Sequence, residues 1–154
     1  MAIIKTIKGD LIDLFKKGEF KVIAHGANCF STMGSGIAGQ IRQHFPEAYE
    51  SDKLDNRGSL IKLGSLSYAV TKYGKIVNLY TQFEPGRNFE YCALKSAINE
   101  LEEWLRSKSQ IEGVAYPVIG IPLIGAGIGG GNWNVIKTIF EKSSLEFIVV
   151  EWDK

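Results

Sequence analysis

The chain has few cysteines and no block of charge of one sign. Its 154 residues include two cysteines, Cys29 and Cys92, and neither lies in a CxxC or Cys/His ligand spacing. A disulfide framework and a structural zinc site are therefore not expected. Lysine and arginine total 18 against 17 aspartates and glutamates, which gives a net charge of +1. Such a nearly equal number of positive and negative residues argues against binding long nucleic acids by counterion release.

Long apolar runs are also missing. No segment reaches the roughly 18–20 apolar residues needed to span a bilayer, and the N-terminal MAIIKTIKGD lacks the apolar run of a signal peptide. We therefore expect a cytoplasmic protein without a membrane partner. The length suits one domain over residues 1–154, which we expect to be a monomer.

Strand-like and helix-like segments alternate along nearly the whole chain. Apolar runs predict strands over residues 2–7, 20–24, 114–125 and 145–152. A hairpin is predicted over residues 66–82, around Tyr73-Gly74. Apolar spacing predicts helices over residues 9–18, 36–45 and 88–108, and in the segment that carries Trp133, Ile136, Ile139 and Phe140. This order predicts a three-layer α/β domain on a mixed sheet.

Glycine is abundant in two similar loops. GSGIAG at residues 34–39 and GAGIGG at residues 125–130 both match G-x-G-x-x-G and both lead into a predicted helix. In dinucleotide-binding folds this motif forms a tight turn directly after a strand and belongs to a βαβ unit. The first copy begins about ten residues after the predicted strand 20–24, and the second leaves too little chain for such a unit. Neither copy fits a nicotinamide-binding context.

The two loops together suggest another kind of anion site. Glycine permits positive φ, so successive N–H groups can point into one concavity, and a helix N-terminus adds partial positive charge. Ligands of open α/β sheets collect outside the carboxyl ends of the strands. If both loops lie at that edge, they can hold a diphosphate from two sides. The alternative is that each glycine only permits tight packing.

Polar residues follow the predicted strand 20–24. Asn28 can grip a sugar hydroxyl or hold an attacking water, or it can stabilise an Asx-turn. His25 can act as a general base or bind a hydroxyl, or it can be a structural residue. Cys29 has no visible activating partner and is expected to be packed. Cys92 is expected to lie in a helix and to belong to the hydrophobic core.

Three motifs resemble the macro domain family. They are GDL at residues 9–11, AHGANCFSTMGSGIA at 24–38 and IPLIGAGIGGGNW at 121–133. Their order and separations agree with the family over nearly the whole chain. The His-x-x-Asn-Cys run at 25–29 and Trp133 resemble the branch that contains ADP-ribose 1''-phosphate phosphatases and ADP-ribosyl-glutamate hydrolases. The resemblance implies a three-layer α/β/α macro domain with a mixed, mostly parallel central sheet.

The resemblance also implies ADP-ribose as the ligand. Two glycine loops that hold a diphosphate predict a single deep cleft that needs no metal, and no cofactor is expected. Asp10, which can cap the helix 9–18, would contact the adenine amine, and Leu11 would line the adenine pocket. Asn28 would reach the distal ribose, and Trp152 would flank the adenine or pack at a strand end. The residues that would enclose the ribose and diphosphate are Gly34, Ser35, Gly36, Ile37, Gly125, Ala126, Gly127, Ile128 and Gly129.

Two departures from the family shape the functional hypotheses. Hydrolases that remove ADP-ribose from glutamate carry a lysine at the end of a middle strand and an aspartate in the second loop. Here Gln82 or Phe83 stands near the lysine position, and Gly129 near the aspartate position.

The first hypothesis is therefore hydrolysis of ADP-ribose 1''-phosphate to ADP-ribose and phosphate. Asn28 would hold the water, and His25 or the loop amides would stabilise the developing charge. The alternatives are a non-catalytic reader of ADP-ribose, free or on a modified protein, and a hydrolase that removes ADP-ribose from proteins. A nicotinamide-dependent enzyme is a further alternative.

Overall fold

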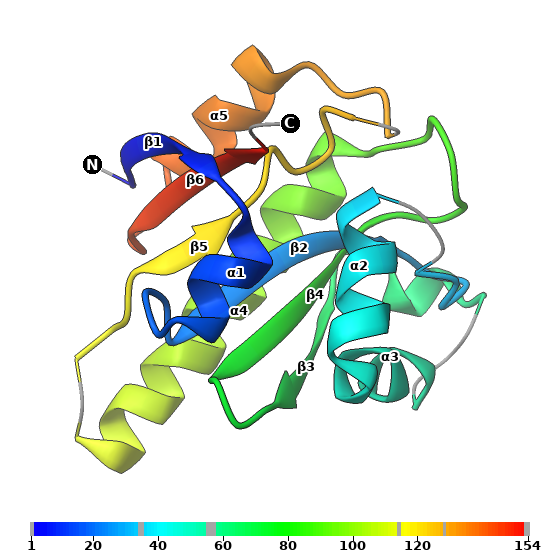
Figure 1. The fold of residues 1–154 in the computed structure, drawn as a ribbon. Coiled ribbons are helices and arrows are strands. Elements are labelled where there is room, and N and C mark those ends of the chain that lie inside the picture. The colour runs from blue at the N-terminus through cyan, green and yellow to red at the C-terminus, as the bar shows by residue number, and fades with distance from the viewer. Residues whose placement is uncertain (1, 34–35, 55–57, 114, 128, 153–154) are drawn as a thin grey trace.

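A computed structural model describes residues 2–33, 36–54, 58–113, 115–127 and 129–152, and these form one six-stranded sheet between two layers of helices (Figure 1). The strands are β1 (Ile3–Gly9), β2 (Val22–Asn28), β3 (Leu66–Val70), β4 (Lys75–Gln82), β5 (Ile119–Ile121) and β6 (Phe147–Trp152). Their order in space is β1-β6-β5-β2-β4-β3, and only the β3–β4 pair is antiparallel. The predicted mixed, mostly parallel α/β sheet is confirmed.

Helices cover both faces of this sheet because neighbouring strand residues point to opposite faces. The elements are α1 (Leu11–Lys16), α2 (Gly36–His44), α3 (Pro46–Lys53), the short 3₁₀ turn η1 (Leu60–Lys62), α4 (Tyr91–Glu112) and α5 (Trp133–Glu141). Ile23 and Ile76 pack with the first three helices, whereas Ala24 and Val77 pack with α4 and α5. In the part of the chain that is described, no helix is long and apolar enough to cross a membrane.

The central strand β2 differs from its prediction. Residues 20–24 were expected to form it, but it runs from Val22 to Asn28. It pairs with β4 along this whole length, from Val22 opposite Lys75 to Asn28 opposite Gln82. Pairing with β4 therefore carries the strand through His25 and Gly26, where the apolar pattern is lost. His25 and Asn28 belong to the strand itself and do not follow it.

The strand β5 and the residue Cys92 also differ from expectation. The apolar region 114–125 forms a strand only over Ile119–Ile121, because Pro122 has no N–H to donate to a neighbouring strand. Cys92 lies in the first turn of α4 and is exposed, so its assignment to the core was wrong. The apolar stripe of α4 begins only at Ala93 and Leu94, which are buried. Cys29, by contrast, is fully buried as expected.

Candidate ligand-binding site

Two adjoining cavities lie beyond the carboxyl ends of β2, β4 and β5. The main cavity has a volume of about 510 Å³ and the second about 330 Å³. They form one continuous cleft, since both are lined by Gly36, Ile37, Pro122, Leu123 and Gly127. Both volumes lie within the range that is common for small-molecule sites. The cleft therefore occupies the edge of the sheet where α/β folds bind ligands.

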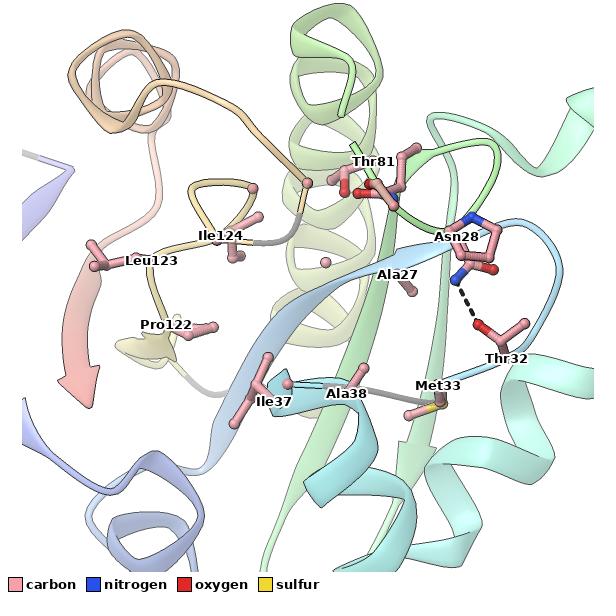
Figure 2. A pocket seen from close by; sticks show the side chains of 18 residues that line it. Ala27, Asn28, Thr32, Met33, Ile37, Ala38, Thr81, Pro122, Leu123 and Ile124 are labelled. Carbon is pink, nitrogen blue, oxygen red and sulfur yellow. Dashed lines mark hydrogen bonds between the residues drawn. The ribbon is translucent and has the colours of Figure 1, made fainter. Parts of the chain in front are cut away.

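Figure 2 shows the main cavity with Asn28 and Thr32 on one side and Leu123 and Ile124 on the other. Its remaining lining residues are Gly26, Ala27, Met33, Ala38, Thr81, Gln82, Pro85, Gly86, Gly125 and Gly129. The second cavity adds Gly9, Leu11, Gln40, Val150 and Trp152. Among these described lining residues none has a charged side chain, so the groups suited to an anion are neutral donors, above all backbone N–H groups and the N-terminus of α2.

The Asn28 side chain is held at the rim of the main cavity by two hydrogen bonds. Its Oδ1 accepts from the Phe30 N–H at 2.9 Å, which closes an Asx-turn, and its Nδ2 donates to Thr32 Oγ1 at 2.8 Å (Figure 2). The amide group can still accept and donate one further bond each. The two roles considered for Asn28 are therefore compatible, because the turn fixes the amide beside the cavity.

The first glycine loop reaches the cleft through the N-terminus of α2. Gly36 and Ile37, the first two residues of this helix, line both cavities. The first turn of α2 carries no acidic residue that would occupy its N–H groups. Gly34 and Ser35 lie outside the described residues. The structure therefore places Gly36 and Ile37 in the cleft, and their contact with a ligand stays a prediction.

The second glycine loop contains glycines of two kinds. A Cβ on Gly125, Gly129 or Gly131 would come within 3.0 Å of a neighbour, which is the Phe89 ring for Gly125 and the Gln82 side chain for Gly129. These glycines permit tight packing, as the alternative interpretation held. A Cβ on Gly127 would meet no atom of the described residues within 4 Å, and Gly127 lines both cavities. Gly127 is therefore the glycine of this loop that leaves room for a ligand.

The other two residues expected in this loop are placed as follows. Ala126 is half-buried and packs on the core beneath the loop, and it does not line either cavity. Ile128 lies outside the described residues.

His25 is not brought to the cleft. Its side chain is fully buried, and its Nε2 lies 2.6 Å from Oδ1 of Asn78. Asn78 uses its Nδ2 to donate to Ala48 O in α3 and to Ser67 Oγ, so its Oδ1 must accept and Nε2 of His25 must carry the proton. Burial lowers the pKa of His25 below its usual value of 6.5. A neutral imidazole on the α3 side of the sheet does not reach the cavity beside Asn28.

Cys29 follows Asn28 but is not placed as a nucleophile. Burial raises the pKa of its thiol to about 11, so the thiolate is scarce at neutral pH. Its N–H donates to the carbonyl of Phe83 at 3.0 Å, which ties the loop after β2 to the end of β4. Among the described residues, no cluster of three or more histidine, cysteine, aspartate or glutamate side chains is arranged to hold a metal.

The second cavity lies between α1 and the end of β6. Leu11 and Trp152 both line it, and Trp152 remains 46% exposed. Asp10 caps α1, with its Oδ1 accepting from the N–H groups of Ile12 and Asp13. The capping role considered for Asp10 is therefore confirmed, and the carboxylate lies next to the cavity-lining Leu11. An apolar and an aromatic side chain thus belong to the same cavity lining.

Comparison with known structures shows which fold this is. The macrodomain of Mycobacterium tuberculosis DarG superposes with a TM-score of 0.76 at 18% identity, and the match covers 96% of this chain and 97% of that one. The fold is that of a macrodomain. No protein-family model matches the chain.

Sequence relatives extend the comparison to two further proteins. The chain is 48% identical over 158 residues to an uncharacterized 17.5 kDa protein of the tk-vs intergenic region of Enterobacteria phage T4, covering 98% of this chain and 97% of the phage protein. The chain belongs to the family of this phage protein. It is also 26% identical over 171 residues to an ADP-ribose 1''-phosphate phosphatase of Scheffersomyces stipitis, covering 95% of this macrodomain and 98% of the phosphatase.

The positions where this macrodomain departs from the glutamate-directed hydrolases take structural roles. Gln82 lines the main cavity, and its Nε2 donates to the carbonyls of Glu84 and Gly86 at 2.8 Å each. Phe83 packs edge-to-face on Phe30 with ring centroids 5.0 Å apart. Trp133 packs against the core around α5 and does not line either cavity.

Several cleft residues were missed by the sequence analysis. Thr81 at the end of β4 and the segment 122–124 after β5 line the main cavity, as do Thr32 and Met33 in the loop after β2. The general rule that ligands meet the carboxyl ends of strands would have pointed to Thr81 and to 122–124. For Thr32 and Met33, only the folded loop reveals their position.

Proposed function

We propose that this macrodomain binds ADP-ribose in the cleft. The adenine occupies the second cavity between Leu11 and Trp152, with Asp10 near its amine. The diphosphate lies between the N-terminus of α2 and Gly127, where both cavities meet, and the distal ribose occupies the main cavity beside Asn28. The uncharged lining supports this proposal, because backbone N–H groups and a helix N-terminus suit a diphosphate.

We further propose that the reaction is hydrolysis of ADP-ribose 1''-phosphate to ADP-ribose and inorganic phosphate. The observation that carries it is the Asn28 amide, which Phe30 and Thr32 hold in place at the cavity rim. Asn28 positions a water for attack on phosphorus, and the P–O bond to the ribose breaks. Since an amide is not a base, one proton of the water passes through a phosphate oxygen to the departing ribose oxygen, which leaves as a hydroxyl, and the other proton stays on the inorganic phosphate. The phosphatase at 26% identity supports this choice of substrate. His25 has no part in the proposed reaction.

Phosphorus NMR of the protein mixed with ADP-ribose 1''-phosphate tests binding and chemistry together. In the wild type we expect a growing inorganic phosphate signal. Asn28→Ala should slow its growth at least tenfold, because a positioning group is lost. Asn99→Ala is the matched control, since Asn99 is exposed on α4 away from the cleft and should leave the rate unchanged. Equal rates in the wild type and in Asn28→Ala would contradict the proposed role of Asn28.

A non-catalytic reader of ADP-ribose is the second candidate. It is favoured by one observation, that the described cleft lining contains no titratable side chain that could act as an acid or base. In the same NMR experiment, broadened diphosphate signals without release of phosphate would support the reader. Removal of ADP-ribose from proteins by a lysine nucleophile is less well supported. Gln82 stands near the position of that lysine at the end of β4, and its side chain donates hydrogen bonds to two carbonyls.

A further inference from the structure

A buried ion pair lies beneath the loop that follows β2. The ammonium nitrogen of Lys62 in η1 lies 3.1 Å from a carboxylate oxygen of Asp52 in α3, and neither side chain is exposed to solvent. Complete burial of these residue types is rare, because both charges must be removed from water. Apolar residues of similar volume would often stabilise a fold equally well, so the pair calls for another explanation.

Every N–H donor of the Lys62 ammonium group has an acceptor. Besides the carboxylate, it donates to the backbone oxygen of Asp52 at 2.7 Å and to Oγ of Ser31 at 3.0 Å. The carboxylate also accepts from the Tyr80 hydroxyl at 2.6 Å, and the Tyr80 ring lies 4.5 Å from the ammonium nitrogen. The other carboxylate oxygen of Asp52, Oδ2, is buried without a hydrogen-bond partner among the described residues. The bonds made by the ammonium group and by Oδ1 fix the positions of Lys62, Asp52 and Ser31 relative to one another.

The cluster holds Ser31 in an unusual backbone conformation. Ser31 has a φ of +58° and Met33 a φ of +40°, in the left-handed region that non-glycine residues seldom adopt. Such conformations persist where the surroundings over-determine them, often at functional sites. The Ser31 hydroxyl lies 3.1 Å from the backbone oxygen of Asp52 and 3.3 Å from its carboxylate, and it accepts from Lys62. Ser31 is thus held by both members of the ion pair.

The strained segment carries side chains of the main cavity. Asn28, Thr32 and Met33 line this cavity, and Ser31 lies between them in the chain. The bond from Asn28 Nδ2 to Thr32 Oγ1 requires Thr32 to turn back toward the end of β2. A change of Ser31 to an ordinary φ would redirect the chain at Thr32 and break this bond. The orientation of the Asn28 amide therefore depends on Ser31.

We infer that Lys62 and Asp52 are positioning residues of the cleft: through Ser31 they hold Asn28 and Thr32 in the orientation that the ligand meets. The inference rests on the proposed function for the identity of the ligand. It does not depend on that function for the geometry of the loop, so the two can be tested apart.

Ser31→Gly is the sharpest test. Glycine adopts this φ without strain, so the variant should still fold, but it also adopts other φ values, and the hydroxyl contacts that restrict the segment to one path are lost. We expect the Kd for ADP-ribose, measured by isothermal titration calorimetry, to rise about tenfold. The Asn28 side-chain amide signals in ¹H–¹⁵N spectra, identified by their absence in Asn28→Ala, should shift or broaden. Ser144→Gly, which removes a hydroxyl contact with Glu102 far from the cleft, should change neither.

The double variant Lys62→Met/Asp52→Asn removes the pair without leaving a buried unpaired charge. It should show the same rise in Kd and the same change in the Asn28 signals. Lys53→Met is its control, because Lys53 also belongs to α3 and forms an ion pair, but an exposed one with Glu50 at 3.2 Å. If the double variant does not fold, Ser31→Gly decides the question by itself.

The outcomes separate this inference from the proposed function. A wild type that binds ADP-ribose, together with a Ser31→Gly variant of equal Kd and unchanged Asn28 signals, would overturn the inference and leave the ion pair as a support of the fold. A wild type that does not bind ADP-ribose would overturn the proposed function instead. The Asn28 signals of the free protein would then decide the positioning role, since they need no ligand.

Discussion

At the scale of single residues, the segment 25–29 shows how neighbours in sequence take different roles. His25 points toward α3 and bonds to Asn78, whereas Asn28 lines the main cavity. Cys29 is fully buried and bonded through its backbone to Phe83. Of these three side chains, which could all take part in chemistry, only that of Asn28 lies at the cleft.

The two cysteines should differ in reactivity. Cys92 is exposed at the start of α4, whereas Cys29 is buried and its pKa is raised to about 11 by burial. We expect a thiol-specific reagent at pH 7.5 to modify one thiol per folded chain and two in denaturant, counted by absorbance. The folded Cys92→Ser variant should remain unmodified. Rapid labelling of Cys29 in that variant would contradict the buried, protonated thiol.

At the scale of elements, the second glycine loop and the loop after β4 fold against each other. Phe89 from the latter packs under Gly125 and Gly131, and its N–H donates to the Gly129 carbonyl at 3.2 Å. The N–H of Gly131 closes the glycine loop on Gly125 O at 2.7 Å. The glycine loop is thus shaped from below by Phe89, while Gly127 faces the cleft.

Alanine at two glycines of this loop should have very different effects on the free energy of unfolding. Gly125 has a φ of +77°, and a Cβ there would lie 2.5 Å from the Phe89 ring, so Gly125→Ala should lower the free energy of unfolding by about 2–4 kcal/mol. At Gly127 a Cβ would meet none of the residues that the structure describes, so Gly127→Ala should change this free energy by less than about 0.5 kcal/mol. Urea unfolding measures both. Equal destabilisation by the two variants would show that Gly127 is also packed.

At the scale of the whole molecule, the sheet brings distant segments to one edge. The parallel strands β2, β4 and β5 are neighbours in the sheet, with β2 between the other two, although β5 lies more than 90 residues after β2 in the chain. The cleft forms where their following loops meet α1, α2 and β6. A ligand in the cleft would therefore contact elements from most of the fold and should stabilise the molecule as a unit.

ADP-ribose should raise the melting temperature. At a concentration of 100 times Kd, linkage adds about 2.7 kcal/mol to the free energy of unfolding, which corresponds to roughly 5–11 °C for a domain of this size. Differential scanning calorimetry measures this shift. Gly127→Glu places a bulky negative charge where both cavities meet, and it should melt normally but show no shift with ADP-ribose. A full shift of the melting temperature in that variant would show that ADP-ribose binds outside the cleft.

Stability should fall in mild acid because of His25. Burial lowers the pKa of His25 in the folded state below 6.5, so the unfolded chain takes up its proton first as the pH falls. The contribution of the neutral His25 to the free energy of unfolding is fully present above about pH 6.5. It is lost below that pH, by at most about 1.4 kcal/mol per pH unit. Urea unfolding between pH 7.5 and 5 measures the slope.

Two histidine variants isolate this contribution. His25→Leu should be less stable at pH 7.5, because Asn78 loses its partner, but its stability should depend less on pH than that of the wild type. His44→Gln should keep the wild-type slope, since His44 is exposed at the end of α2. An unchanged slope in His25→Leu would assign the pH dependence to other groups.

The sequence predicted much of the fold because local patterns suffice for it. The helix cap at Asp10, the apolar stripe of α4 and the hairpin of β3 and β4 follow from residue type and spacing, and the structure has all three. The end of β2 and the exposure of Cys92 were predicted wrongly. Both depend on which partner an element meets, through pairing with β4 for the strand and through the packed face of α4 for the cysteine.

The sequence by itself determined the fold class, the two glycine loops and the candidate Asn28. Only the tertiary structure separated Gly127 from the packed glycines, turned His25 away from the cleft and joined Lys62 to Asp52 and Ser31. The physical reason is the range of the forces involved. Turn and helix preferences act between neighbours in the chain, whereas burial, ion pairing and the shape of a cavity arise between segments that meet only when the sheet forms.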